Sequence, residues 1–155
     1  MLLFLDTIPY ITIFIFGITI GSFLNVCIYR LPLGESVVTA PSHCMTCGRK
    51  LRWYDMVPVF SWLVLGGKCR NCKSKISVQY PIIEGVNGIL YVVIFAVNGL
   101  VWSSVIYCLM ASALLVLSVI DWRTYEIPFG INVFLFVLGI AMAVLDRGNL
   151  AEHLI

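Results

Sequence analysis

Long apolar blocks alternate with short polar segments along this chain. The apolar blocks cover roughly residues 8–28, 82–98, 101–120 and 129–145. A helix needs about 20 mostly apolar residues to cross the roughly 30 Å of hydrocarbon in a bilayer. The pattern therefore predicts about four transmembrane helices, the last close to the lower limit of length. We expect an all-α polytopic membrane protein.

Positive charge is concentrated in one polar segment. The chain is 61% hydrophobic and 12% charged, and about twice that charged fraction is usual in a soluble domain. No Lys or Arg precedes the first block, so we expect a retained helix and not a cleaved signal. Because loops rich in Lys and Arg stay in the cytoplasm, we expect the segment between the first two helices there, with the N-terminus and Asp146 outside. Eight of the ten basic residues lie in this segment: Arg30, Arg49, Lys50, Arg52, Lys68, Arg70, Lys73 and Lys75.

Two C-x2-C pairs lie in this cytoplasmic loop. Their separation is typical of a zinc-ribbon-like site in which four thiolates hold one structural zinc ion. Gly48 follows the first pair, where a positive φ is expected, and Lys73 takes the same place after the second. A redox dithiol and cysteines without a special role are the alternatives, and we interpret His43 as a neighbour and not a ligand. Cys27 and Cys108 are expected to be packing residues of apolar helices. The candidate ligands are Cys44, Cys47, Cys69 and Cys72.

Small residues recur on one face of the first helix. Gly17, Gly21 and Asn25 are four residues apart, so they stack on one side. The G-x-x-x-G spacing lets another helix approach closely, and Asn25 is placed to hydrogen-bond to that helix. Gly85, Asn87 and Gly88 predict a similar close-packing face on the second helix.

Two carboxylates near the membrane boundary are candidate functional residues. Glu84 lies near the start of the second helix, where a carboxylate is costly and is a functional candidate by default; the alternative is pairing with a cation of the loop. Asp121 opens the polar segment DWRTYEIP at the end of the third helix. An isolated Asp at such a boundary is usually only solvated.

The apolar segment Met56–Leu65 either packs over the zinc site or lies on the membrane surface.

Four motifs, taken in order, resemble those of the bacterial prepilin peptidases. They are GSFLNVCIYRLP at 21–32, the two C-x2-C pairs flanking LRWYDMVPVFSWL, SVQYPIIE at 77–84 and DWRTYEIP at 121–128. The resemblance covers nearly the whole chain. It implies an enzyme of the bacterial inner membrane that cuts basic leader peptides from type IV pilin-like precursors at the cytoplasmic face. It further implies N-methylation of the new N-terminus with S-adenosylmethionine as methyl donor.

The resemblance also assigns regions and roles. It implies a first transmembrane helix at 1–30, a cytoplasmic four-cysteine loop associated with methyl transfer at 31–80, and the N-terminal part of the peptidase domain at 81–155. Asp121 matches the first of two catalytic aspartates, and Glu84 is the methyl-transfer candidate. Two nearby carboxylates share a proton, so one activates water while the other protonates the leaving group. The expected cofactors are zinc and S-adenosylmethionine, and the expected partners are prepilin or pseudopilin substrates and the lipid bilayer, with no nucleic acid.

The second catalytic aspartate of that family lies in a G-x-G-D motif, which these 155 residues do not contain. Asp146 is separated from Asp121 by a helix of roughly 25 Å, so it is expected on the opposite face. Two copies of Asp121 meeting across a two-fold axis are the remaining alternative. We therefore expect a peptidase without its C-terminal portion and with little or no proteolytic activity. The alternative function is a non-catalytic membrane zinc protein that binds pilin or secretion-assembly partners, and a weaker one is a small zinc or thiol sensor.

Overall fold

The computed structural model describes the backbone of residues 2–39 and 41–153 and the side chains of residues 7–39 and 41–145. Within these residues the regular secondary structure is helical. Pairing of extended backbone is limited to two isolated bridges, His43 with Lys50 and Lys68 with Lys75. The helices are α1 (Leu2–Arg30), α2 (Phe60–Val64), α3 (Gln79–Asn98), α4 (Trp102–Thr124) and α5 (Phe129–His153), with short 3₁₀ turns η1 (Leu31–Leu33) and η2 (Trp53–Asp55).

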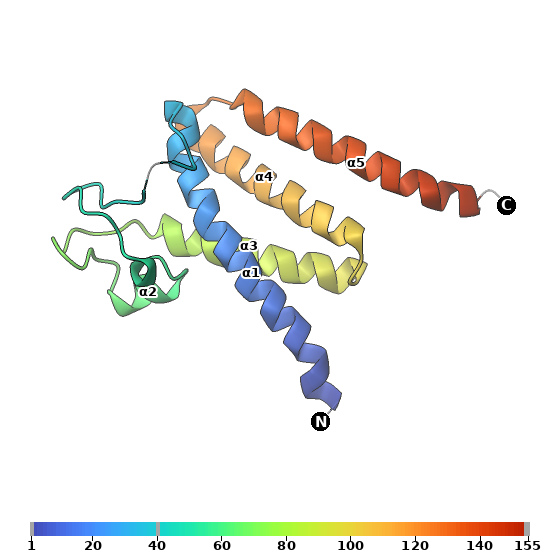
Figure 1. Cartoon of the computed structure of the whole chain (residues 1–155), viewed down its shortest axis with the longest axis horizontal. Coiled ribbons are helices and arrows are strands. Elements are labelled where there is room, and N and C mark those ends of the chain that lie inside the picture. Colours follow the sequence, from blue (N-terminus) through green and yellow to red (C-terminus); the bar gives the residue numbers. More distant parts are fainter. Residues whose placement is uncertain (1, 40, 154–155) are drawn as a thin grey trace.

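The described residues include three helices that are long and apolar enough to cross a membrane. They cover Thr7–Leu33, Gln79–Asn98 and Trp102–Thr124, and Phe129–Leu145 is a shorter apolar helix. The predicted all-α polytopic membrane protein, with three or four apolar helices and a cysteine-bearing loop after the first, is therefore confirmed. Figure 1 shows α3, α4 and α5 running back and forth, with α1 crossing α3 at an angle.

The helices α1 and α3 touch backbone to backbone. A Cβ atom added to Gly17 would lie 2.8 Å from the Cα of Gly88, and one added to Gly21 would lie 2.7 Å from the Cα of Glu84. Real Cβ atoms do not approach so closely, so only glycine fits at this crossing. The predicted close-packing face of α1 is confirmed. On α3 the prediction holds for Gly88 but is wrong for Gly85, whose Cβ would meet open space.

Buried polar side chains join α1, α3 and α4. The Asn87 side-chain amide donates to the Gly17 carbonyl at 2.7 Å and accepts from the Ser112 hydroxyl at 2.8 Å. The Tyr91 hydroxyl lies 3.0 Å from the same Ser112 oxygen. Such hydrogen bonds hold helices together in lipid, where apolar surface gives little preference for protein over bilayer.

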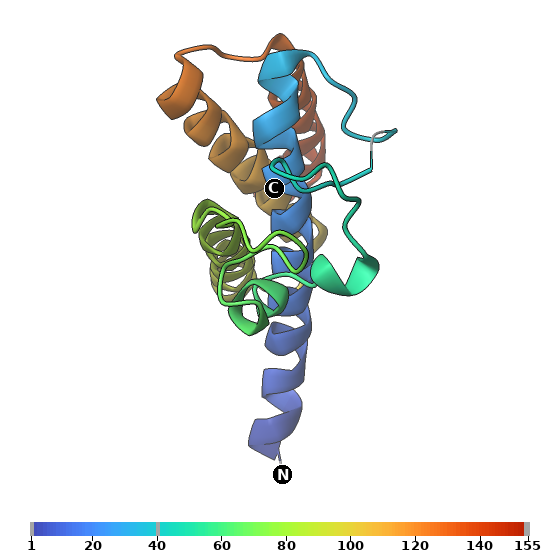
Figure 2. The same cartoon turned by 90° about the vertical axis from the view of Figure 1, so that its left-hand side faces the viewer.

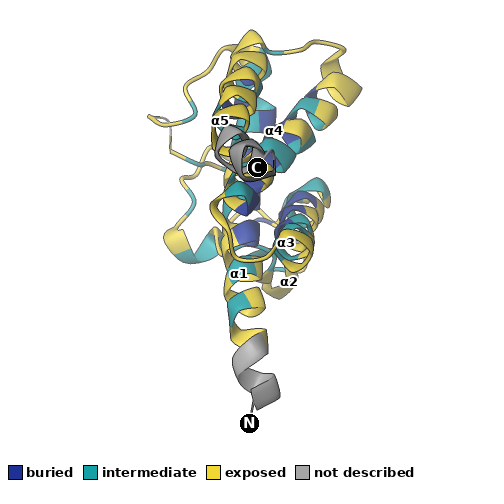
Figure 3. Cartoon of the chain, turned by 90° about the vertical axis from the view of Figure 1, so that its right-hand side faces the viewer, coloured by how far each residue is buried: buried dark blue, intermediate teal, exposed yellow. Residues whose placement is uncertain are grey.

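The apolar core lies where these three helices face one another, and the outward faces are exposed (Figure 3). Cys27 packs against this core and Cys108 is buried within α4, which agrees with their predicted packing roles. Outward residues such as Ile15 and Phe16 on α1 are more than half exposed, as expected for surfaces that meet lipid. The core cluster includes Leu24, Ile28, Ile83, Val116 and Ile120.

One end of the bundle collects the end of α1, the start of α3 and the end of α4. The Tyr29 and Tyr80 rings stack with their centroids 5.5 Å apart, and the Arg123 guanidinium lies 4.4 Å from the Tyr29 centroid. The loop between α1 and α3 lies at this end, and it faces the viewer in Figure 2. The cysteine-bearing loop and the end of α4 therefore share one end of the molecule.

The polar segment DWRTYEIP begins inside a helix and not in a loop. Asp121 belongs to the last turn of α4, which continues to Thr124. The helix ends because Tyr125 takes a left-handed conformation with φ 55° and its N–H donates to the Asp121 carbonyl at 2.8 Å. The connection to α5 is thus shorter than the sequence pattern indicates.

Candidate functional site

The four candidate cysteine ligands come together. Their sulfur atoms all lie within 4.8 Å of one another. Four sulfurs bound 2.3 Å from a tetrahedral zinc ion are roughly 3.8 Å apart, and the Cys44 and Cys72 sulfurs are 3.8 Å apart. The donor set and its spacing therefore fit zinc. His43 is outside this cluster, and its Nδ1 lies 3.3 Å from the Pro41 carbonyl oxygen.

Each C-x2-C pair is held by a tight turn of the same design. The Gly48 N–H donates to the Cys44 carbonyl at 2.8 Å, and the Lys73 N–H donates to the Cys69 carbonyl at 3.0 Å. Both residues that close the turns have positive φ, 68° at Gly48 and 58° at Lys73. Glycine takes this conformation freely, whereas a residue with a Cβ is disfavoured there. The second turn is therefore the strained one, as the sequence indicates.

Hydrogen bonds favour the thiolate form of two of these cysteines. Backbone N–H groups of Cys47 and Thr46 lower the pKa of the Cys44 thiol to about 6. The hydroxyl and backbone N–H of Ser74 lower the pKa of the Cys72 thiol. Thiolates are the form that binds metal, so these hydrogen bonds favour metal binding at Cys44 and Cys72.

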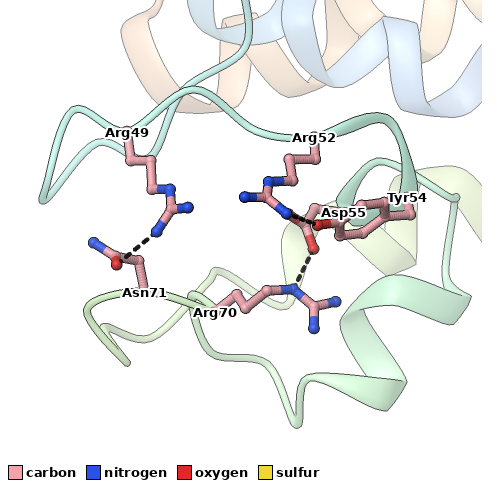
Figure 4. Close-up of polar contacts among 6 residues, drawn as sticks. All are labelled: Arg49, Arg52, Tyr54, Asp55, Arg70 and Asn71. Atoms are coloured by element: carbon pink, nitrogen blue, oxygen red, sulfur yellow. Dashed lines mark hydrogen bonds and ion pairs between the residues drawn. The ribbon is translucent and has the colours of Figure 1, made fainter.

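Side chains from the two halves of the loop tie the cysteine turns together (Figure 4). The Arg49 guanidinium donates to the Asn71 side-chain oxygen at 2.8 Å, and the Asn71 amide reaches the Cys47 sulfur at 3.8 Å. Arg70 forms an ion pair with Asp55 at 2.8 Å. Such contacts around a metal site fix the orientation of its ligands.

The apolar segment between the cysteine pairs has two different faces. Trp62 of α2 is partly buried and its indole N–H donates to the Ile76 carbonyl at 3.3 Å. Phe60, Leu63 and Val64 are 62%, 60% and 81% exposed. The inner face of α2 thus packs on the loop, in line with one of the two sequence interpretations, and the outer face is an exposed apolar surface.

Glu84 is buried inside the protein and does not pair with a loop cation. It is 5% exposed, and its Oε2 accepts a hydrogen bond from the Val59 backbone N–H at 2.7 Å. The ion pair found among the described side chains joins Arg70 to Asp55 instead. The expectation of a boundary residue neutralised by Lys or Arg is therefore wrong, because the loop offers a backbone donor where a cation was expected.

The donor to Glu84 comes from a strained turn. Val59 has φ 60° and ψ −52°, and the Phe60 N–H reaches the Pro58 carbonyl at 2.6 Å. This is a γ-turn of the rare form, and a β-branched residue there costs about 1–3 kcal/mol. Local strain of this kind persists only where its surroundings impose it. The sequence around Val59 contains no glycine that would indicate this turn.

A cavity of about 660 Å³ separates the cysteine loop from the ends of α1 and α3. Asn25 and Glu84 line it, together with the stacked rings of Tyr29 and Tyr80. Asn25 is 1% exposed, and its amide N–H group donates to the Tyr80 carbonyl at 3.2 Å, which confirms the predicted bond to a partner helix. Its side-chain oxygen has no hydrogen-bond partner among the described residues. The loop contributes Asp55, Trp62, Cys69 and Ser74 to the lining.

Asp121 is exposed at the end of the bundle that carries the cysteine loop. Two residues further on, Arg123 contacts Tyr29 at the end of α1. Asp121 does not line the cavity, so the two candidate carboxylates belong to separate surfaces of the same end. The side chain of Asp146 lies outside the described residues.

The fold and the cysteine cluster define a multi-pass membrane protein with a loop at one end of its helices whose four cysteines could hold a metal ion. The family model of the bacterial peptidase A24 N-terminal domain matches residues 15–98, which run from α1 through the loop to the end of α3. The chain belongs to this family, and the resemblance seen in its motifs is confirmed. No solved structure matches.

Known relatives carry names that agree with this family. A prepilin leader peptidase/N-methyltransferase of Myxococcus xanthus is 38% identical over 131 residues, which cover 84% of this chain and 39% of that protein. A type 4 prepilin-like proteins leader peptide-processing enzyme of Escherichia coli is 35% identical over 134 residues, covering 72% of this chain and 48% of that protein. The chain therefore spans less than half the length of these two curated relatives.

Proposed function

We propose that this chain carries the methyl-transfer region and the first peptidase aspartate of a prepilin leader peptidase/N-methyltransferase. The observation that carries the proposal is the shared end of the bundle, where Asp121, Glu84 and the four-cysteine loop lie together. A substrate with an apolar membrane stem and a polar leader would meet all three at one membrane face. The names of the relatives support both activities.

The proposed orientation follows from charge. With most of its Lys and Arg in the loop between α1 and α3, the protein would hold this loop on the cytoplasmic side of the bacterial inner membrane, with the N-terminus outside. Asp121 and Glu84 would then face the cytoplasm as well. Prepilin leaders are basic and are cut on that side in the family that the motifs resemble.

In this proposal Asp121 is one of two aspartates that cut the leader. Its exposure at the end of α4 leaves it open to water and to a peptide bond. Acid–base cleavage needs two carboxyl groups, one ionised and one protonated. Residues 1–155 contain no G-x-G-D motif to supply the second. We therefore expect these 155 residues alone to leave prepilins uncut.

The four cysteines would hold zinc in a structural role. Four protein ligands leave no open position for a substrate, so zinc would fix the fold of the loop and take no part in bond making. The loop in turn forms one wall of the cavity that contains Glu84.

Methyl transfer would take place in this cavity. Its volume of about 660 Å³ is in the range of sites for small organic ligands. S-adenosylmethionine supplies an electrophilic methyl group on a positively charged sulfur. The aromatic ring of Tyr80 lines the cavity and suits such a cation, whereas the ring of Tyr29 already contacts Tyr80 and the Arg123 guanidinium. Glu84 is the proposed carboxylate of the reaction.

The test uses the 155-residue protein in detergent micelles with one equivalent of zinc, a processed pilin with a free N-terminus, and methyl-labelled S-adenosylmethionine. Transfer of label to the pilin N-terminus supports the proposal. Absence of label from folded, zinc-loaded protein that still binds pilin would instead support the second candidate, a non-catalytic pilin-binding zinc protein. The exposed apolar face of α2, formed by Phe60, Leu63 and Val64, is the observation that favours this second candidate.

A further inference from the structure

The cavity beside the cysteine loop is lined, at the ends of α1 and α3, by two buried side chains with hydrogen-bond acceptors to spare. The Asn25 oxygen is buried and without a partner among the described residues. Glu84 is also buried, and an ionised carboxylate offers about four acceptor sites, of which the Val59 N–H fills one and the Ser22 hydroxyl a second. A buried acceptor left without a donor is destabilising. Both groups therefore favour a ligand that brings N–H donors.

These two acceptors line the same cavity, on helices that cross beside it. Gly21 packs directly on the backbone of Glu84, and Asn25 is one turn further along α1. The Asn25 amide is fixed in orientation, since its N–H group donates to the Tyr80 and Gly21 carbonyls at 3.2 and 3.4 Å. Its oxygen is thus held in place and is not free to exchange with the nitrogen.

The basic side chains in the cavity wall do not supply the missing donors. Arg49 donates to Asn71, and Arg70 is paired with Asp55. Arg30 donates to the Ser36 and Pro41 carbonyls, and Arg52 donates to the Tyr54 hydroxyl. Lys50 and Lys75 also line the cavity and are exposed to solvent. Of the two stacked tyrosine rings that line the cavity, Tyr29 already contacts the Arg123 guanidinium, so the attraction for a ligand cation rests on Glu84 and the Asn25 oxygen. The membrane end of the cavity therefore suits a positively charged group with several N–H donors.

We infer that Asn25 and Glu84 bind the α-ammonium group of the processed substrate, the group that receives the methyl in the proposed function on which this inference rests. The ammonium donates one N–H to the Asn25 oxygen and a second to the Glu84 carboxylate. Asn25 is a positioning residue that orients the nitrogen, and Glu84 both binds the amine and acts as general base.

The proposed reaction is a proton transfer followed by a methyl transfer from sulfur to nitrogen. The ammonium gives one proton to the Glu84 carboxylate, which leaves a neutral amine with a lone pair. The amine nitrogen then bonds to the methyl carbon of the sulfonium donor. The carbon–sulfur bond breaks as this bond forms, and its electron pair stays on sulfur as a neutral thioether. The product is a secondary ammonium.

The experiment measures amine recognition separately from methyl transfer. The probe is a synthetic 12-residue peptide amide with the N-terminal sequence of a mature pilin, made with a free N-terminus and with an acetylated one. Binding to the 155-residue protein in micelles is followed by tryptophan fluorescence without any methyl donor. We expect the wild-type protein to bind the free amine at least tenfold more tightly than the acetylated peptide.

The variant Glu84→Gln removes the charge but keeps an oxygen for the Val59 N–H, so the loop contact is preserved. We expect its preference for the free amine to fall below threefold. The matched control Glu126→Gln removes the same charge from an exposed position that does not line the cavity, and its preference should remain at tenfold or more.

Two results would overturn the inference. One is equal affinity of the wild-type protein for the free and the acetylated peptide. This measurement needs no variant, so it does not depend on whether a mutant folds. The other is a folded Glu84→Gln protein that keeps the tenfold preference. Methyl-label transfer by the wild-type protein together with either result would leave the proposed function standing, whereas amine preference without label transfer would overturn only the proposed function.

Discussion

The crossing of α1 and α3 gives the sharpest prediction of stability. In Gly21→Ala the new methyl group would lie 2.7 Å from the Glu84 Cα and 3.2 Å from the Glu84 carbonyl oxygen. Carbon atoms in contact are normally about 3.5–4.0 Å apart, so the helices must separate by roughly 1 Å at this point. The Asn25 bond to Tyr80, already 3.2 Å long, would then be broken, and the Asn87 bond to Gly17 would be weakened.

The magnitude follows from three contributions. Overpacking of this kind costs about 2 kcal/mol. Two interhelical hydrogen bonds in a membrane protein contribute about 1 kcal/mol together. The higher helix propensity of Ala returns about 1 kcal/mol. We therefore expect Gly21→Ala to lower the free energy of unfolding by about 2 kcal/mol, which is roughly a thirtyfold change in the equilibrium constant.

The assay is reversible unfolding in mixed micelles with increasing sodium dodecyl sulfate, followed by far-ultraviolet circular dichroism. The control is Gly85→Ala, one residue from Glu84 on α3, where the added Cβ meets nothing within 4 Å. It should be neutral or stabilising by up to about 1 kcal/mol. Equal stability of the two variants would refute the proposed backbone contact between α1 and α3.

Three further predictions concern the loop and the buried network. Lys73→Gly should relieve a positive φ and tighten zinc binding by about 1 kcal/mol, measured by competition with a chelator. Gly48→Ala should weaken zinc binding in the same assay. An identical change in zinc affinity for both variants would contradict the turn geometry. Cys44→Ser should reduce bound zinc, measured by mass spectrometry, from one ion per chain to well below one, and full occupancy would exclude the four-sulfur site. Ser112→Ala removes the donor to Asn87 and should cost about 0.6–1.7 kcal/mol in the same unfolding assay, while an unchanged midpoint would show that this bond contributes nothing.

The features that the sequence predicted well are local or depend on spacing. The two C-x2-C pairs bring their sulfurs together because each turn is closed by bonds within five residues, and Gly48 marks the required positive φ. The apolar blocks become helices because a chain in lipid must satisfy its backbone internally. The G-x-x-x-G face of α1 needed no knowledge of its partner to be recognised.

The features that the sequence did not predict depend on which segments meet. Gly85 and Gly88 look alike in the sequence, and only the crossing with α1 decides that Gly88 is packed and Gly85 is open. The burial of Glu84 follows from the Val59 turn, which belongs to the loop and has no glycine to mark it. Helices that face lipid are apolar on all sides, so their sequences carry little information about which side faces protein.

The glycine contact between α1 and α3 also decides how the neighbouring cavity admits a ligand. The two helices already touch through their main chains and form one wall of the cavity. Neither helix can move closer to the other, and moving apart would break the contact. The opposite wall is the cysteine loop, which reaches Glu84 through the N–H of one unfavourable turn. A ligand that needs more room is therefore expected to displace the loop and not the helices, and the Val59–Glu84 hydrogen bond is the contact it would break.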